Sequence, residues 1–266
     1  MTRATAVEVQ LIAGEEGCRR ARDQRAVAIV VDALRASATI TMLLHQGASD
    51  VVVVKEVAEA HDYRRAHPDA LLVGERGGLK VDGFDLGNSP TEIQCADVQG
   101  KQVAFTSTTG AQRMVDCLGA SSILVGTTIN ATEVARQAAA LARRAHVPVV
   151  IIPAGLATNP DILEEEDWLG AVVLAASMDI PLSPASEGPF AHFQQLIRSP
   201  GLHERFLRST HGERLVRLGF TDDIRLCAQV DLIHDTVPTL EEVIPLPHGG
   251  RGLRLRRGNM QYATPL

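Results

Sequence analysis

The chain has 266 residues and a formal net charge of −6, with 45% apolar, 22% charged and 3% aromatic residues. The acidic balance and the lack of a basic stripe argue against a nucleic-acid partner, and the low aromatic content argues against base stacking. No apolar run approaches the ~20 residues of a membrane span, and the N-terminus lacks the apolar core of a signal peptide. The four cysteines are scattered, as expected for free thiols in a reducing compartment. The sequence therefore predicts a cytoplasmic protein without nucleic-acid or membrane partners.

Three segments share the order strand, polar turn, helix. The strands are expected at residues 28–31, 103–105 and 149–152, and the second and third are followed by helices near 111–118 and from about 162. Strands that alternate with helices indicate βαβ units and a largely parallel sheet. Further helical segments are expected at residues 57–66, 131–145, 189–199 and 201–219, the last of them at the surface.

These units predict an α/β fold, namely a three-layer α/β/α arrangement with a mixed, mainly parallel sheet. The first two units are each followed by Gly-Ala-Ser, which either an internal βαβ duplication or βαβ geometry alone would explain. We expect one domain over residues 1–245, with two lobes divided near residue 145 as the alternative. Residues 246–266 are rich in glycine and arginine and are interpreted as a partly ordered C-terminal tail.

Polar residues follow each predicted strand: Asp32 and Arg35 the first, residues 106–110 the second, and residues 154–159 the third. Ligands bind at the carboxyl ends of parallel strands, so turns on neighbouring strands would converge on one site. Hydroxyl and free backbone N–H groups favour an anion there, and Arg35 would hold it. Asp32 is a metal ligand, a base or a nucleophile, or it is only a helix cap with Arg35 as its surface partner.

A glycine-rich loop at residues 74–90 is the next candidate. Its charged residues, among them Glu75, Arg76 and Lys80, are either solvated or functional, and its glycines indicate close approach of backbone to a ligand. The loop ends in Asn88 and Ser89, which can donate hydrogen bonds.

An acidic run at residues 164–167 begins a predicted helix. It is interpreted mainly as a complement to the helix dipole, with one or two members turned inward to hold Mg²⁺. Asp222 and Asp223 are interpreted in the same way, and their role as a complement to the helix dipole is favoured over metal binding. His192 and His211 are expected at the surface.

Several common catalytic motifs are absent from the sequence, including GxxxxGK[ST], GxGxxG, HExxH and GxSxG. Asp32 follows an apolar strand, as the nucleophile of haloacid-dehalogenase-type phosphatases does. Those enzymes need a second aspartate two positions later, where this chain has Leu34.

Four motifs taken together resemble the 2-phosphosulfolactate phosphatase (ComB) family. They are D-A-L-R-A-S-A-T at 32–39, G-E-R-G-G-L-K at 74–80, G-F-D-L-G-N-S-P at 83–90 and the Thr-Thr-Gly turn at 108–110. The resemblance covers roughly residues 5–245, and it also includes E-E-D-W-L-G-A at 165–171.

The resemblance implies a Mg²⁺-dependent hydrolase that removes phosphate from 2-phospho-3-sulfolactate, a step toward coenzyme M. Its partner would be a small anionic phosphorylated substrate, and a homodimer is compatible with the sequence. We expect Asp32 and Arg35 to be catalytic, and Asp32, Glu75 and Glu166 to hold the metal. Substrate contacts are expected from Arg76, Lys80, Asn88, Ser89, Thr108, Thr109 and Gly110.

Two strand ends depart from the family pattern. Thr109 stands where asparagine is typical, with Ala111 in place of the following threonine, and Pro153 stands where cysteine is usual. These departures leave two alternatives open. One is a phosphatase for another phosphorylated hydroxy acid, and the other is a non-catalytic protein that binds a small anion on the same fold.

Overall fold

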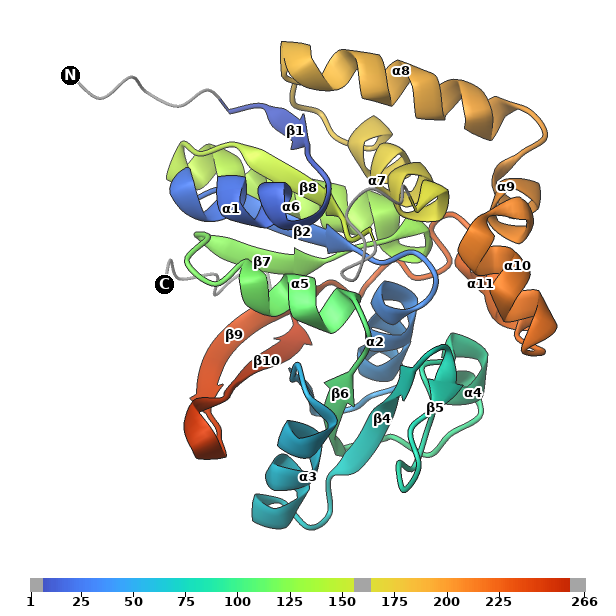
Figure 1. Cartoon of the computed structure of the whole chain (residues 1–266). Helices are drawn as coiled ribbons and strands as arrows, with labels where there is room; N and C mark the ends of the chain where they lie inside the picture. Colours follow the sequence, from blue (N-terminus) through green and yellow to red (C-terminus); the bar gives the residue numbers. More distant parts are fainter. Residues whose placement is uncertain (1–6, 156–163, 259–266) are drawn as a thin grey trace.

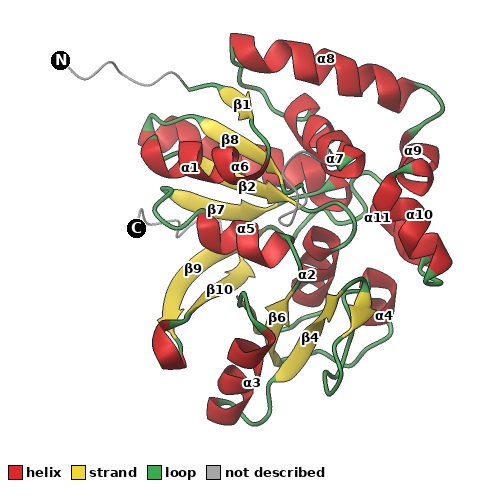
Figure 2. Ribbon diagram, viewed as in Figure 1, coloured by secondary structure: helices red, strands yellow, loops and turns green. Residues whose placement is uncertain are grey.

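The computed structural model describes residues 7–155 and 164–258. Their strands form one ten-stranded sheet in the order β1-β8-β2-β7-β9-β10-β3-β6-β4-β5, with helices on both sides (Figure 1; Figure 2). The predicted three-layer α/β fold with a mixed, mainly parallel sheet is confirmed. No helix in these two ranges is long and apolar enough to cross a membrane.

Four strands form a first parallel block: β1 (Val9–Leu11), β8 (Val149–Pro153), β2 (Val27–Val31) and β7 (Ser122–Val125). All residues of β2 and β8 are buried, as expected for parallel strands covered on both faces. On one face lie α1 (Gly14–Asp23) and α5 (Gly110–Asp116), and on the other lie α6 (Ala131–Ala145) and α7 (Glu165–Ala176), with the short η1 (Thr128–Asn130) before α6.

A second block contains the parallel strands β3 (Asp50–Val53), β6 (Gln102–Thr106) and β4 (Leu71–Arg76), with β5 (Leu79–Lys80) antiparallel at its edge. Helix α3 (Val57–Ala66) packs on β4 and β6, and α4 (Pro90–Gln94) packs on α2 (Ala36–His45). Helix α2 is buried along residues 36–44 because it packs across the central strands. Its small and hydroxyl residues suit this position, since Thr41 Oγ1 donates to its own helix at Ser37 O over 2.8 Å.

A hairpin of β9 (Pro238–Pro245) and β10 (Arg251–Arg257), with η2 (Pro247–Gly249) at its turn, joins the two blocks. Strand β9 pairs antiparallel with β7, and β10 pairs antiparallel with β3. The interpretation of residues from 246 onwards as a tail is therefore wrong for the described residues up to 258. Leu253 and Leu255 are fully buried, and this alternation of apolar with Arg residues is the signal of a half-buried strand.

Four helices at the end of the chain pack beside α7 and α4: α8 (Pro184–Arg198), α9 (Leu202–Arg208), α10 (Thr210–Arg217) and α11 (Thr221–Cys227). The expectation of a surface helix over residues 201–219 is wrong in part, because Phe206 and Leu215 are fully buried. The segment is two short helices, and the start of the second faces the cavity described below.

The hairpin's packing can be tested by truncating one buried side chain. Replacing Leu253 by Ala should lower the free energy of unfolding by about 2–5 kcal/mol, because it leaves a cavity in the hydrophobic core that covers this face of the sheet. The matched control is Arg256→Ala, whose side chain is 48% exposed and should change stability little. Urea unfolding of both variants measures the difference, and equal effects would show that β10 is not part of the core.

Candidate active site

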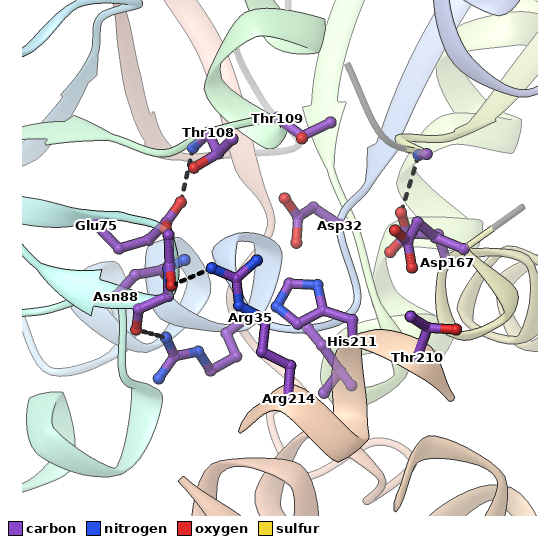
Figure 3. A pocket seen from close by; sticks show the side chains of 15 residues that line it. Asp32, Arg35, Glu75, Asn88, Thr108, Thr109, Asp167, Thr210, His211 and Arg214 are labelled. Atoms are coloured by element: carbon purple, nitrogen blue, oxygen red, sulfur yellow. Dashed lines mark hydrogen bonds between the residues drawn. The ribbon is translucent and has the colours of Figure 1, made fainter. Parts of the chain in front are cut away.

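A cavity of about 200 Å³ lies where the ends of β2, β4, β6 and β8 converge. Three antiparallel pairings separate the two blocks. The curved β9–β10 hairpin sets the blocks at a steep angle to each other, and residues at the carboxyl ends of both line the cavity (Figure 1). Six of the residues expected in the site from the sequence line this cavity: Asp32, Arg35, Glu75, Asn88, Thr108 and Thr109 (Figure 3).

Asp32 follows β2 directly and its carboxylate faces the cavity. Its Oδ1 accepts a hydrogen bond over 3.3 Å from the N–H of Ala36, the first residue of α2, but the N-cap position belongs to Arg35 and not to Asp32. Burial raises the pKa of Asp32 to about 6, helped by the negative charge of Glu75 and opposed by the backbone N–H groups of Ala36 and Gly110. Asp32 thus binds the first N–H group of α2 and has a carboxyl group with a pKa of about 6.

Gly110 begins α5 beside Asp32. A Cβ atom at this position would lie 2.6 Å from Asp32 Oδ2 and 3.0 Å from Ala36 Cβ, distances that no ordinary side chain permits. The Thr-Thr-Gly turn therefore needs glycine here because its backbone touches the aspartate.

Glu75 ties two loops of the site together. Its Oε1 accepts from Thr108 N over 2.7 Å and its Oε2 accepts from Gly78 N over 2.6 Å. With both oxygens engaged by backbone N–H groups, the carboxylate fixes the glycine turn against the turn after β6. This gives Glu75 a positioning role that the sequence did not indicate.

Arg35 is buried rather than a surface partner of Asp32, and only 2% of its side chain is exposed. Its Nη1 donates to Asp223 Oδ2 over 2.7 Å, its Nη2 donates to Gly78 O over 2.7 Å, and the guanidinium stacks on Phe220 at 4.1 Å. Asp223 lies in the first turn of α11, as the expected complement to the helix dipole would, but it is buried and also holds Arg35. A single buried ion pair connects the start of α2, the glycine turn and α11.

Asp223 also organises the start of α4. Its Oδ1 accepts from Ser89 Oγ over 2.8 Å, from Thr91 Oγ1 over 2.5 Å and from Thr91 N over 3.1 Å. Ser89 caps α4 by accepting from Glu92 N, so its hydroxyl serves the loop instead of facing the cavity. The preceding residue Asn88 does line the cavity, and its buried Oδ1 has no hydrogen-bond partner among the described residues.

Arg76 and Lys80 do not line the cavity formed by the described residues. Arg76 donates to Glu75 O, Lys55 O and Thr106 Oγ1, because consecutive residues of a strand point to opposite sides and Glu75 already faces the site. Lys80 is exposed, and its Nζ lies 3.4 Å from Asp85 O.

Helix α10 contributes residues that the sequence analysis missed. Thr210, His211 and Arg214 line the cavity from the side opposite Thr108 and Thr109 (Figure 3). The expectation that His211 lies at the surface holds only in part, because its side chain is 35% exposed but lines the cavity. Burial together with the charge of Arg35 lowers the pKa of His211 to about 4. His211 and Arg214 are three residues apart in the sequence, and this spacing could have predicted that both side chains lie on the same face of a helix. His192, in contrast, is exposed as expected.

Three members of the acidic run turn inward, more than the one or two expected. Glu164, Glu166 and Asp167 are 8%, 1% and 4% exposed, whereas Glu165 points out toward Arg205. Asp167 Oδ1 accepts from Ala33 N and its Oδ2 accepts from Gly155 N, which joins α7 to the ends of β2 and β8. Burial and the charges of Asp32 and Glu166 hold the pKa of Asp167 well above its usual range.

The expected metal set of Asp32, Glu75 and Glu166 is not brought together as one group. A different group does come together, namely Glu164, Glu166 and His211. Within the described residues it is the one set of three or more His, Cys, Asp or Glu side chains whose possible metal-donor atoms all lie within 4.8 Å of one another. Asp32 lies close enough to Asp167 for their negative charges to oppose each other, which contributes to the raised pKa of Asp167. Mg²⁺ is commonly held by one or two carboxylates and waters, which Asp32 and Asp167 can provide.

The fold and the cavity define an α/β protein with carboxylates and hydroxyl-bearing turns at its strand ends. The sequence model of a family described as 2-phosphosulpholactate phosphatase matches residues 12–243. A "Probable 2-phosphosulfolactate phosphatase" of Carboxydothermus hydrogenoformans is 35% identical over 236 residues, covering 87% of this chain and 92% of that protein. Proteins of the same description from Deinococcus radiodurans and Parasynechococcus marenigrum are 34% and 36% identical, covering 84% and 80% of this chain and 91% and 88% of theirs. The chain belongs to the 2-phosphosulfolactate phosphatase family, as the sequence motifs indicated.

Removing one partner of the buried ion pair should be costly. Asp223→Asn leaves the Arg35 guanidinium buried without a counter-charge, and we expect a loss of about 3–5 kcal/mol in the free energy of unfolding. The control is Asp222→Asn, because Asp222 is 76% exposed and pairs with Arg225 at the surface. Urea unfolding at pH 7, followed by the fluorescence of Trp168, measures the free energy of unfolding of both variants. If both variants lose a similarly small amount of stability, the Arg35–Asp223 ion pair is not structurally important.

The raised pKa of Asp32 predicts a pH-dependent gain in stability when its charge is removed. A folded pKa of about 6 against 3.8 means that the folded state binds the proton more tightly, so this carboxyl costs stability as pH rises from about 4 to about 6. Asp32→Asn should therefore be more stable than the parent above pH 6, by up to about 3 kcal/mol, and nearly equal to it below pH 4. Urea titrations in EDTA across this range test the difference, and a constant offset at all pH values would contradict it.

Proposed function

We propose that this protein is a Mg²⁺-dependent phosphatase that hydrolyses 2-phospho-3-sulfolactate, or a similar small anionic phosphomonoester, to 3-sulfolactate and phosphate. The family supports phosphomonoester hydrolysis, because its members are described by that reaction. The cavity of about 200 Å³ suits a small substrate. A reaction of this kind in the cytoplasm would be a step toward coenzyme M.

The observation that carries the proposal is the wall of carboxylates around the cavity. Asp32, Glu75, Glu164 and Asp167 all line it, while the Arg35 charge is already balanced by Asp223. An anionic substrate would be repelled by such a wall unless a cation entered with it. This favours a divalent ion held by Asp32 and Asp167. When bound, Mg²⁺ would neutralise charge on the phosphoryl oxygens.

Asp32 is the residue best placed to act on the phosphate. With a pKa of about 6 it is mostly ionised at pH 7 and can take up a proton from an attacking water, which is the task of a general base. The same carboxylate could instead attack phosphorus and form a covalent aspartyl-phosphate. Borohydride treatment of the quenched reaction distinguishes the two routes, because it reduces an aspartyl-phosphate to homoserine and leaves a free carboxylate unchanged.

Recognition of the substrate falls to neutral donors and one cation. Thr108 and Thr109 offer hydroxyl groups from the turn after β6, and the amide of Asn88 faces the cavity from the opposite block. Arg214 uses its Nη2 for Gly77 O over 2.8 Å and has further donors for a carboxylate or sulfonate. The substrate's anionic groups would thus be met by donors on both sides of Asp32.

The decisive experiment measures phosphate release by the purified full-length protein. With Mg²⁺ it should hydrolyse 2-phospho-3-sulfolactate, EDTA should stop the reaction, and Asp32→Asn should reduce the rate by at least ~10³-fold while the protein stays folded. Glu165→Gln, which changes an outward-facing neighbour in the acidic run, should retain activity.

Two other outcomes decide between the alternatives. Hydrolysis of other phosphorylated hydroxy acids in preference to 2-phospho-3-sulfolactate would favour a changed substrate, in line with Thr109 at the cavity. If no phosphomonoester is hydrolysed although phosphate or sulfolactate raises the melting temperature, the protein is a small-anion binder. Activity that survives Asp32→Asn would leave Asp32 only its contact with the first N–H group of α2.

A further inference from the structure

A group of three side chains lies at the edge of the cavity and shares Glu164 with its wall of carboxylates. Glu164 and Glu166 come from the start of α7, and His211 comes from the first turn of α10. One donor atom of each lies within 4.8 Å of the others. Glu164 and His211 also line the cavity, so the group is reached from the same opening.

Each of the two glutamates has a buried carboxyl oxygen that the described residues leave without a partner. Glu164 and Glu166 are at least nine-tenths buried, and Oε2 of each lacks a hydrogen-bond partner among the described residues. A buried carboxylate oxygen without a partner is costly, and two such carboxylates side by side repel each other. Such a pair is stable only with a shared proton or with a bound cation.

The distance between the imidazole and a carboxylate favours a shared cation over a direct contact. His211 Nδ1 lies 3.7 Å from Glu166 Oε1, which is too long for a hydrogen bond. Two ligands bound to one ion at about 2.1 Å lie roughly 3.0–3.5 Å apart, so a small movement would bring both into coordination.

We propose that Glu164, Glu166 and His211 bind a first-row transition-metal dication, such as Mn²⁺ or Zn²⁺, at the edge of the cavity. Two carboxylates with one imidazole suit these ions, whereas Mg²⁺ prefers an all-oxygen shell of carboxylates, phosphate and water. The site differs from the Asp32 and Asp167 pair that would hold Mg²⁺. It does not depend on phosphatase activity, since the ion would bind whether or not the protein hydrolyses a phosphomonoester.

Mn²⁺ is the better probe, because the exposed thiol of Cys95 could bind Zn²⁺ elsewhere on the chain. Untagged full-length protein is titrated with Mn²⁺ and the free ion is followed by electron paramagnetic resonance. We expect one saturable ion per chain that a tenfold excess of Mg²⁺ does not displace. Electron spin-echo modulation of the bound ion should show coupling to a ¹⁴N nucleus from His211.

Substitutions test the ligands individually. Glu166→Gln and His211→Gln should each weaken Mn²⁺ binding at least tenfold, and His211→Gln should abolish the ¹⁴N coupling. Glu165→Gln is the matched control, since its side chain points away from the group, and it should leave the affinity unchanged.

Three results would overturn the inference. They are no saturable Mn²⁺ binding to the parent protein, bound Mn²⁺ without ¹⁴N coupling, and equal loss of affinity in Glu165→Gln and Glu166→Gln. The first two need no variant, so they remain decisive if a substitution prevents folding. Phosphate release is measured separately, so failure of this site and failure of the proposed phosphatase activity give different results.

Discussion

The buried ion pair between Arg35 and Asp223 connects the parts of the molecule that form the cavity. Arg35 stands at the start of α2, donates to the glycine turn after β4, and meets Asp223 from α11, which in turn receives Ser89 and Thr91 at the start of α4. Each of these segments comes from a different region of the chain. Because a buried charge is tolerated only when its partners are in place, the pair fixes their relative positions. The consequence for function is that Arg35 shapes the site more than it neutralises a substrate.

With that charge already balanced, the remaining electrostatics of the cavity are dominated by carboxylates. Asp32 and Glu75 face it from the two blocks, and Glu164 and Asp167 from α7, against one further arginine on α10. Burial raises the pKa values of Asp32, Glu164, Glu166 and Asp167, so part of the negative charge is relieved by bound protons at neutral pH. A cation would replace those protons and draw an anion into the cavity. Under the proposed function, the wall that would repel a phosphate ester alone would bind one together with a metal ion.

Much of the fold was predictable, because local pattern and short βαβ connections determine it. Helices α3 and α6 have the bounds expected from periodicity, and β2, β6 and β8 lie within a residue or two of the expected strands. The position of β10 was not predictable, since a short run of alternating Leu and Arg gives no sign of its partners. The site was predictable where residues directly follow strands, as for Asp32 and Thr109. It was missed where the residue arrives through tertiary packing, as for His211, Arg214 and Asp223, whose local sequences indicate only polar helices.

The two departures from the family pattern have different weight in this structure. Pro153 is the last residue of β8 and is fully covered beside Val31, so it does not line the cavity formed by the described residues. Thr109 lines the cavity and precedes Gly110, whose backbone touches Asp32. A threonine hydroxyl can donate and accept as an amide does, but it is shorter and presents one polar atom in place of two. Threonine at this position therefore offers a ligand fewer hydrogen-bonding atoms than asparagine would, while the contact between Gly110 and Asp32 is unchanged. The substitution thus bears more directly on which substrate is bound than on the reaction at Asp32.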